Sequence, residues 1–275
     1  MSKVTISEVS TAKAITTARL LAMKQDQQKI AMITAYDATF ATVFEQAGAH
    51  AILIGDSLGM VLQGEDSTLS VTVEDMAYHT RCVAKGCSTA LIVADLPFMS
   101  YSNPELACTN AATLMRAGAH MVKLEGGDWL AETISQLTRQ GVPVCGHLGL
   151  TPQSVHVFGG FKLQGRDLDQ AAKIKADAKA LEAAGIQLLV LECVPSPLAK
   201  EITALLSIPV IGIGAGPDTD GQVLVMQDAL GLTTGYVPKF TKNFLAEQPS
   251  VKAAISAYVT DVAAGRFPGP EHSFN

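Results

Sequence analysis

Two kinds of segment alternate along this chain. Short continuous apolar runs rich in Val, Ile and Leu recur throughout, and longer segments with helical periodicity lie between them. Continuous apolar runs are typical of parallel strands that are covered on both faces. The pattern predicts about eight strands, at 30–36, 50–56, 90–96, 120–125, 142–148, 187–192, 208–214 and, with a weaker apolar pattern, 235–239.

The intervening segments predict helices at 38–47, 72–85, 103–117, 128–140, 168–184, 197–206, 219–230 and 250–264. A weak internal repeat supports this order. The stretches "EQAGAHAILIGD", "MRAGAHMVKLEG" and "EAAGIQLLVLEC" each contain a helix end, a glycine, a strand and a carboxylate. The glycines are Gly48, Gly118 and Gly185, which fit the left-handed position that ends a helix.

These units predict an α/β protein with a single domain over 1–275, because no Pro- or Ser-rich linker divides the chain. Eight regularly spaced units without a dinucleotide-binding fingerprint favour a (βα)8 TIM barrel over a doubly wound open sheet. Residues 1–29 predict a leading N-terminal helical segment rather than a transit peptide. The loops 57–71 and 149–167 are longer than a barrel needs, and their polar, Gly-rich character is typical of lids over a site.

Composition narrows the class of partner. Of the 275 residues, 48% are apolar and 17% charged, which supplies a large core, and the net charge is −6. There is no basic patch for a nucleic acid and no apolar run long enough to span a membrane. The five cysteines stand at unrelated spacings without a CxxC pair, which indicates core residues in a reducing cytoplasm.

Polar residues collect where the predicted strands end. In a parallel barrel the functional site lies at the C-terminal ends of the strands. Carboxylates arrive there from four different strands. The polar residues at these positions are Asp56 and Ser57 on the second strand, Asp95 on the third, Lys123 and Glu125 on the fourth, Cys145 and His147 on the fifth, and Glu192 on the sixth.

Burying several carboxylates together is costly unless positive charge lies among them. Lys123 and Glu125 are two residues apart and share a face of their strand. One lysine cannot neutralise four carboxylates, whereas a hard divalent cation such as Mg²⁺ or Mn²⁺ can do so through oxygen ligands. The alternative is that these carboxylates cap the helices that follow or pair with arginines outside the cluster.

Three roles stay open for His147: a base, a donor to substrate, or a strand-end residue with satisfied hydrogen bonds. Cys145 and His147 together are a poor zinc signal, since no further Cys/His pair stands near them in sequence. The "GIGAG" stretch at 212–216 fits an anion site built from backbone amides, but also a tight turn. The other histidines have no motif context, and we expect structural roles for them; they are His50, His79, His120, His156 and His272.

The same segments carry a resemblance to a known family. They read "ITAYD", "GDSLGM", "VTVEDMAYHT", "ADLPFMSY", "AATLMRAGAHMVKLEGG", "PVCGHLGLTPQSV", "LLVLECVP", "IPVIGIGAG", "PKF" and "EHSF". In this order they resemble the 3-methyl-2-oxobutanoate hydroxymethyltransferases, also called ketopantoate hydroxymethyltransferases. The resemblance runs from about residue 30 to the C-terminus, where Asn275 departs from the histidine of the family pattern.

This resemblance implies a barrel of the phosphoenolpyruvate/pyruvate class. It implies transfer of a one-carbon unit from 5,10-methylenetetrahydrofolate, as co-substrate, to 3-methyl-2-oxobutanoate, which gives 2-dehydropantoate on the pantothenate pathway. It further implies one Mg²⁺ per subunit and a cytoplasmic homo-oligomer, commonly a decamer.

The resemblance also assigns roles to matching positions. Asp56 and Asp95 resemble direct magnesium ligands, and Glu125 a third residue of the metal site. Asp56, Ser57, Asp95 and Lys123 resemble the substrate contacts, and Glu192 the general base. These roles suit an enolate mechanism, because a metal-chelated 2-oxo acid loses its C3 proton more easily and a placed base contributes about 10²–10⁴-fold.

Three rivals use parts of the same pattern. Another metal-dependent enzyme of the same barrel class, such as a carbon–carbon lyase, would have the same carboxylates. A Schiff-base aldolase with Lys123 as nucleophile would need that lysine free of carboxylates, yet Glu125 shares its face. A non-catalytic barrel that only binds would leave the clustered carboxylates without a role.

Overall fold

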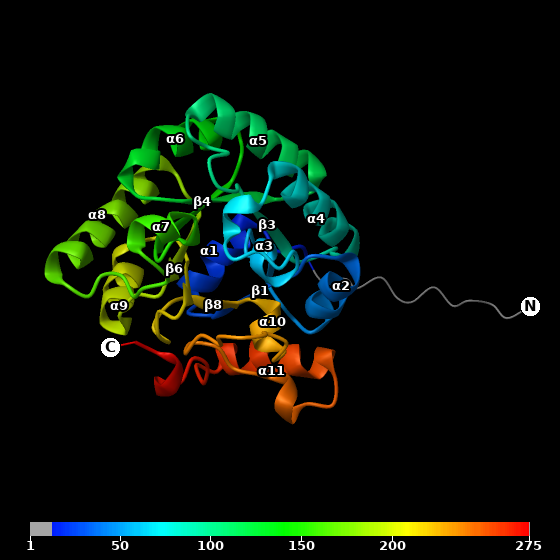
Figure 1. Cartoon of the computed structure of the whole chain (residues 1–275). Helices are drawn as coiled ribbons and strands as arrows, with labels where there is room; N and C mark the ends of the chain where they lie inside the picture. Colours follow the sequence, from blue (N-terminus) through cyan, green and yellow to red (C-terminus); the bar gives the residue numbers. More distant parts are fainter. Residues whose placement is uncertain (1–12, 275) are drawn as a thin grey trace, which may run out of the picture.

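Eight parallel strands close into a barrel in the computed structural model, which describes residues 13–274 of the chain. Each strand pairs with its neighbours in chain order, and the last pairs with the first. The predicted (βα)8 barrel is therefore confirmed (Figure 1). The strands are β1 (Ile30–Thr34), β2 (Ala51–Ile54), β3 (Leu91–Asp95), β4 (Met121–Glu125), β5 (Val144–Gly149), β6 (Leu188–Glu192), β7 (Val210–Ile213) and β8 (Gly221–Leu224).

The longer helices form a ring around the barrel, as Figure 1 shows. Most begin at a residue whose side chain caps the first turn, such as Asp37, Thr72 and Asn103. The α-helices are α1 (Thr17–Gln25), α2 (Ala38–Gln46), α3 (Leu58–Val61), α4 (Val73–Gly86), α5 (Pro104–Ala117), α6 (Ala131–Arg139), α7 (Val155–Phe158), α8 (Leu168–Ala184), α9 (Ser196–Leu205), α10 (Met226–Ala229) and α11 (Val251–Ala263).

The predicted position of the eighth strand was wrong. Residues 235–239 form no strand, and β8 lies instead within the segment predicted as a helix over 219–230. Only α10 is helical in that segment. A strand of four residues is too short to show a period, and the apolar spacing of "GQVLVMQDAL" resembles a helix. The strand is defined by its pairing with β1 and β7, which closes the barrel.

A buried glutamine also made β8 difficult to recognise in the sequence. The side-chain amide of Gln222 donates to the Gly216 carbonyl at 3.0 Å and to the Thr219 hydroxyl at 2.9 Å. These bonds satisfy a polar group that would otherwise be costly inside the protein. Gln222 therefore interrupts the apolar run that identified the other strands.

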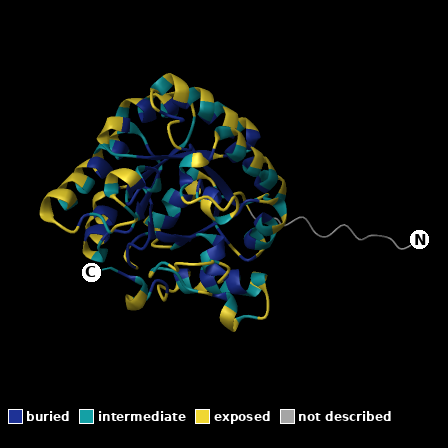
Figure 2. Ribbon diagram, viewed as in Figure 1, coloured by how far each residue is buried: buried dark blue, intermediate teal, exposed yellow. Residues whose placement is uncertain are grey.

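The core has two layers. Figure 2 shows the buried strands surrounded by helices that carry exposed residues. One layer packs between the outer face of the barrel and the helices, and the other fills the barrel interior. Leu20 and Met23 of α1 belong to the interior layer, so this helix closes the end at which the strands begin. The predicted leading helix is thus present as α1, whereas residues 1–12 lie outside the described part of the chain.

At the end of the barrel where the strands begin, side chains link neighbouring strands in pairs. The residue directly before each even-numbered strand accepts a hydrogen bond from a backbone N–H near the start of the preceding odd-numbered strand. The acceptors His50, His120, Gln187 and Asp220 receive bonds of 3.1, 3.2, 2.8 and 2.8 Å from Ala31, Ile92, Val144 and Val210. His50 and His120 therefore have structural roles, as predicted.

The repeat identified in the sequence has a structural counterpart. Gly48, Gly118 and Gly185 adopt φ values of +99°, +116° and +111°, a region that residues with a Cβ rarely enter. Gly118 and Gly185 end α5 and α8 in the left-handed conformation. Each glycine turns the chain from the end of a helix into the next strand.

Both long loops carry short helices at the C-terminal mouth. The loop 57–71 contains α3 and the 3-10 helix η1 (Thr68–Ser70), and the loop 149–167 contains η3 (Pro152–Ser154) and α7. Contacts join η1 to η3, so the two loops meet over the strand ends. Across residues 13–274, no helix has the length and apolar character needed to cross a bilayer.

Candidate active site

The strand ends bring the predicted residues into one buried cluster. Asp95 pairs in register with Lys123 on the neighbouring strand, and Glu125 pairs with His147. Side chains of residues in register point to the same side of the sheet, so all four face the barrel axis. Together with Asp56 they are almost fully buried. We call Asp56, Asp95, Lys123, Glu125 and His147 the acidic cluster.

Lys123 lies at the centre of the acidic cluster. Its Nζ atom is 3.2 Å from Asp95 Oδ2 and 3.6 Å from Glu125 Oε1. Burial alone would lower the pKa of Lys123, but the charges of Asp95, Glu125 and Asp56 outweigh it and raise that pKa. Lys123 is therefore an ammonium ion held among carboxylates.

His147 bridges two glutamates. Its Nδ1 atom is 3.1 Å from Glu125 Oε1, and its Nε2 atom is 3.4 Å from Glu192 Oε2. Burial and Lys123 lower the pKa of His147, but Glu125 and Glu192 outweigh them and raise it to about 9. The imidazole is thus charged at neutral pH. Lys123 Nζ lies 3.3 Å from His147 Nδ1. Glu125 Oε1 lies within 3.6 Å of both nitrogens, so its negative charge offsets the repulsion between the two cations.

The three carboxyl groups of the acidic cluster outnumber its two cations, Lys123 and His147. Burial, Glu125 and Asp95 raise the pKa of Asp56 well above its ordinary value, and burial raises the pKa of Asp95 although Lys123 opposes it. One oxygen of Asp95, Oδ1, is buried without a hydrogen-bond partner. An unpaired buried carboxylate oxygen and an acid that resists ionisation both indicate a place for additional positive charge.

The carboxylates at the strand ends do not have the alternative role of helix caps. The caps of the helices that follow β2, β3 and β6 are Ser57, Asn103 and Pro195. In the described residues, the ion pairs of Asp95, Glu125 and Glu192 are with Lys123 and His147 rather than with arginine. The carboxylates therefore face one another at the mouth instead of serving separate helices.

Ser57 lies at the edge of the cluster. It occupies the position before α3, yet its side chain makes no capping bond. Its hydroxyl is instead 3.0 Å from the hydroxyl of Tyr36, a buried residue that follows β1. Burial raises the pKa of Tyr36 to about 12, so the phenol keeps its proton. Ser57 therefore presents a hydroxyl to the mouth beside Asp56.

Glu192, at the end of β6, adjoins the acidic cluster through His147 and has a more apolar setting toward β7. It is 15% exposed and pairs in register with Ile213, whose side chain belongs to the barrel-interior core. Val190, two residues earlier on the same face, belongs to that core as well. The mouth thus has a charged side formed by β2 to β5 and an apolar side formed by β6 and β7.

Two residues of the site were not singled out from the sequence. Gln153 and Tyr101 reach the acidic cluster from the loops after β5 and β3. Both stand in quoted stretches, "LGLTPQSV" and "ADLPFMSY", but neither ends a strand. Their partners are far away in sequence, 97 residues in the case of Gln153 and Asp56. No local pattern reports such a contact.

The remaining candidates have simple structural accounts. Cys145 is buried beside the cluster, and burial raises the pKa of its thiol to about 12. Cys193, which follows β6, is also buried, and all five cysteines are unpaired. The "GIGAG" stretch begins inside β7 and bends at Gly214 and Ala215, and Gly214 and Gly216 take positive φ values. A Cβ at Gly216 would meet Ser196 at 2.3 Å, so close packing requires this glycine.

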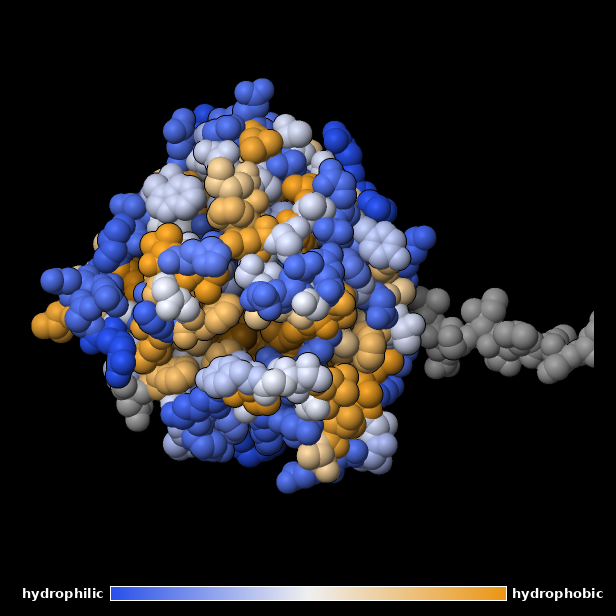
Figure 3. Space-filling view, viewed as in Figure 1, coloured by the Kyte–Doolittle hydropathy of each residue, from blue (hydrophilic) through white to orange (hydrophobic). Residues whose placement is uncertain are grey.

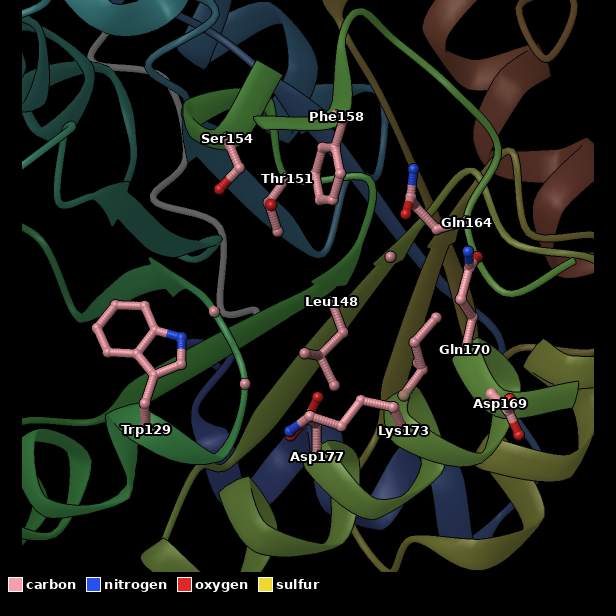
Figure 4. A pocket seen from close by; sticks show the side chains of 14 residues that line it. Trp129, Leu148, Thr151, Ser154, Phe158, Gln164, Asp169, Gln170, Lys173 and Asp177 are labelled. Atoms are coloured by element: carbon pink, nitrogen blue, oxygen red, sulfur yellow. The ribbon is translucent and has the colours of Figure 1, made fainter. Parts of the chain in front are cut away.

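A cavity of about 500 Å³ lies beside the site, between the β4 and β5 loops and α8 (Figure 4). Trp129, Leu148 and Lys173 line it. Leu148 belongs to the outer core layer, whereas its neighbour His147 faces the barrel axis. At Leu148 the cavity therefore lies on the outer face of the strand that carries His147.

The mouth is hollowed near the centre of the face that carries α3 and α7, with apolar side chains around the hollow (Figure 3). Exposed apolar residues of the surrounding loops include Met60, Leu62, Phe98 and Met99. In residues 13–274, no three or more His, Cys, Asp or Glu side chains are grouped so that they could hold a metal ion.

A closed parallel barrel with a buried charged cluster at its C-terminal mouth defines a (βα)8 barrel of the enzyme type. Solved structures share this fold. A complex of phosphonopyruvate hydrolase with oxalate and Mg²⁺ has a TM-score of 0.61 at 13% identity, covering 78% of this chain and 83% of that chain. For 2,3-dimethylmalate lyase, a PEP mutase/isocitrate lyase superfamily member, the values are 0.57, 16%, 80% and 84%.

The family follows from closer relatives. The model of the ketopantoate hydroxymethyltransferase family matches residues 14–270, and the chain belongs to this family. A 3-methyl-2-oxobutanoate hydroxymethyltransferase of Aeromonas salmonicida (strain A449) is 69% identical over 261 residues, which cover 95% of this chain and 99% of that protein. One from Colwellia psychrerythraea is 66% identical over 260 residues, covering 94% and 98%. The resemblance stated from the motifs is confirmed.

Proposed function

We propose that this protein transfers a one-carbon unit from 5,10-methylenetetrahydrofolate to 3-methyl-2-oxobutanoate and forms 2-dehydropantoate for pantothenate synthesis. Family membership and the names of the relatives support the reaction. The observation that carries the proposal is the two-sided mouth, with Lys123 and Asp95 3.2 Å apart on the charged side and Glu192 beside Ile213 on the other. A 2-oxo acid with a branched apolar end has the same two-sided character.

The charged side suits the 2-oxo acid end of the substrate. The Lys123 ammonium supplies positive charge for a carboxylate or an enolate oxygen, and the Ser57 hydroxyl supplies a hydrogen-bond donor. The branched carbon and its methyl groups then lie toward Ile213 and Val190. This orientation brings the C3 proton to the side of the mouth on which Glu192 stands.

Asp56 and Asp95 fit a magnesium ion better than Glu125 does. Magnesium is usually held by one or two carboxylates together with substrate oxygens and water, and Asp95 has an unpartnered oxygen. Glu125 uses one oxygen for His147 and Lys123 and the other for the backbone N–H of Gln153. We therefore assign Asp56 and Asp95 as the direct ligands and give Glu125 a supporting role at the metal site. When bound, Mg²⁺ would withdraw electron density from the keto group and so acidify the C3 proton.

Glu192 acts as the base in this proposal. Its carboxylate accepts the C3 proton, and a placed base of this kind contributes about 10²–10⁴-fold to the rate. His147 lies 3.4 Å from Glu192 Oε2 and orients that carboxylate. The C3 carbon then forms a bond to the methylene carbon of the folate, both carbon–nitrogen bonds of that methylene break, and water supplies the hydroxyl oxygen. The two folate nitrogens take up the proton lost from C3 and the second proton of the water. The folate brings its own reactive carbon, so the protein needs only to place it.

A coupled assay tests the proposal. Consumption of 3-methyl-2-oxobutanoate should require 5,10-methylenetetrahydrofolate and Mg²⁺ and should stop when a chelator is added. Addition of excess Mg²⁺ should restore it. Consumption of the acid without the folate would instead indicate another reaction of the same barrel class, such as carbon–carbon cleavage.

The assembly and location are separate proposals. We propose a cytoplasmic homo-oligomer, and the family resemblance gives a decamer as the count. Exposed apolar side chains at the mouth and on α4, such as Phe98, Met99 and Tyr78, support burial against other copies. Light scattering after size-exclusion chromatography should give about ten times the 28.8 kDa mass of one chain. A mass equal to one chain would contradict this assembly.

A further inference from the structure

Gln153 enters the acidic cluster from a loop rather than from a strand. It lies in η3, within the loop 149–167, and only 6% of its surface is exposed. Its side chain reaches the carboxylate of Asp56, which follows β2. A polar side chain this deeply buried needs partners for each of its hydrogen-bonding groups.

The amide of Gln153 has such partners, and they fix its orientation. Nε2 donates to Asp56 Oδ2 at 2.8 Å and to the Leu96 carbonyl at 3.0 Å. Oε1 accepts from the hydroxyl of Tyr101. If the amide were flipped, Oε1 would face the Asp56 carboxylate and the Leu96 carbonyl, and both of these groups are acceptors. The contacts with Tyr101 and Leu96 therefore keep an N–H of Gln153 directed at Asp56.

The backbone of Gln153 contacts a second carboxylate. Its N–H donates to Glu125 Oε2 at 3.0 Å. The same tyrosine completes the arrangement, because the backbone N–H of Glu125 lies 3.3 Å from the Tyr101 hydroxyl oxygen. Gln153 and Tyr101 thus connect the carboxylates that follow β2 and end β4 with a loop that covers the mouth.

We infer that Gln153 is a positioning residue for Asp56. By donating to Oδ2 it holds the carboxylate in one rotation and leaves Oδ1 for the cation and the 2-oxo acid. In the described residues, Asp56 Oδ1 accepts no hydrogen bond. This inference rests on the proposed function, since it assigns Asp56 to the metal and substrate. Partners that orient a metal-binding carboxylate commonly affect metal affinity by about 10–100-fold.

The variant Gln153→Met tests the inference, because methionine has a similar length and no hydrogen-bond donor. We expect Mg²⁺ to bind about 10–100-fold more weakly in calorimetric titrations without substrate. The KM for 3-methyl-2-oxobutanoate should rise, while kcat at saturating Mg²⁺ and acid should change by less than about tenfold, since Gln153 does not touch the reacting atoms. The matched control is Gln164→Met in the same loop, because among the described residues the Gln164 side chain bonds only to the Lys162 carbonyl.

Tyr101→Phe supplies an independent measurement. It removes the hydroxyl that fixes the amide orientation, so Mg²⁺ binding should weaken in the same direction. The two residues act through one set of hydrogen bonds, and the double variant should therefore bind Mg²⁺ no more weakly than Gln153→Met alone. Additive losses would show that the residues act separately and would overturn the inference.

A merely structural role gives a different result. In that case Gln153→Met lowers the melting temperature, but the protein that remains folded binds Mg²⁺ and the acid as the wild type does, and the inference is wrong. If the wild-type protein binds no Mg²⁺, the proposed metal is wrong. The dissociation constant of the acid alone then decides: a rise of about tenfold or more in Gln153→Met supports the positioning role, and an unchanged value overturns it.

Discussion

The ammonium nitrogen of Lys123 lies 3.2 Å from Oδ2 of Asp95, and both side chains are almost fully buried. A lysine that forms a Schiff base must be able to lose its proton, which burial in an apolar pocket promotes. Here Asp95, Glu125 and Asp56 raise the pKa of Lys123. Lys123 therefore keeps its proton and acts through its positive charge rather than as a nucleophile that forms a Schiff base.

Borohydride added together with 3-methyl-2-oxobutanoate should therefore trap no adduct on Lys123. Intact-protein mass spectrometry before and after the treatment measures this, and a borohydride-treated sample without the acid is the control. A gain in mass localised to Lys123 by peptide mapping would replace the enolate mechanism with the Schiff-base alternative.

Asp56→Asn and Asp95→Asn should each remove most of the Mg²⁺-dependent rise in melting temperature. Each change removes one charge but keeps the shape, and residues at the C-terminal face of a barrel serve function more than stability. The loss of Mg²⁺ affinity should exceed the about 10–100-fold that follows from losing an outer hydrogen-bond partner. Asp66→Asn, an exposed residue in the loop 57–71, is the matched control. Wild-type Mg²⁺ binding in both variants would show that the metal site is misassigned.

Glu192→Gln should leave binding of Mg²⁺ and 3-methyl-2-oxobutanoate near the wild-type level, because Glu192 is not proposed as a ligand. Exchange of the C3 proton in deuterated water and formation of product should fall together by about 10²–10⁴-fold. Proton NMR measures the exchange without folate, and Glu247→Gln on the surface is the control. If exchange persists while product formation collapses, another group takes the proton, and the role of Glu192 as the base is wrong.

Glu45 provides a test of stability rather than of activity. It accepts bonds of 2.8, 2.6 and 2.9 Å from the backbone N–H groups of Ser88, Thr89 and Ala90, just before β3. Burial would raise the pKa of Glu45, but these bonds and the Ser88 hydroxyl outweigh it and lower the pKa below 4.5. A carboxyl group whose pKa is lower in the folded state than in the unfolded state stabilises the folded protein at pH values above the unfolded-state pKa. This stabilisation is lost as the pH falls through the folded-state pKa.

Glu45→Gln should therefore lower the free energy of unfolding at pH 7 by about 1–2 kcal/mol, since it replaces bonds to a charged acceptor by bonds to a neutral one. The difference from the wild type should shrink as the pH falls below 4.5. Urea unfolding of both proteins at several pH values measures it, with Glu247→Gln as control. A difference that stays constant down to low pH would contradict the role of the Glu45 charge.

The sequence by itself determined the barrel and most of its site. Seven of the strands can be predicted because parallel strands covered on both faces consist of continuous apolar residues. Such a run can be recognised from the segment's own residues alone. Asp56, Asp95, Glu125 and Glu192 were found by the same local rule, as polar residues at the ends of such runs.

Only the tertiary structure decided which of these residues meet and how. The strand β8 depends on pairing with β1, from which it is separated by most of the chain, and not on its own four residues. Gln153 joins Asp56 across 97 residues because the barrel brings the loop after β5 over the end of β2. The charge on Lys123 likewise depends on neighbours contributed by other strands. A local pattern reports what a segment buries, whereas closing the barrel determines which distant side chains lie within hydrogen-bonding distance.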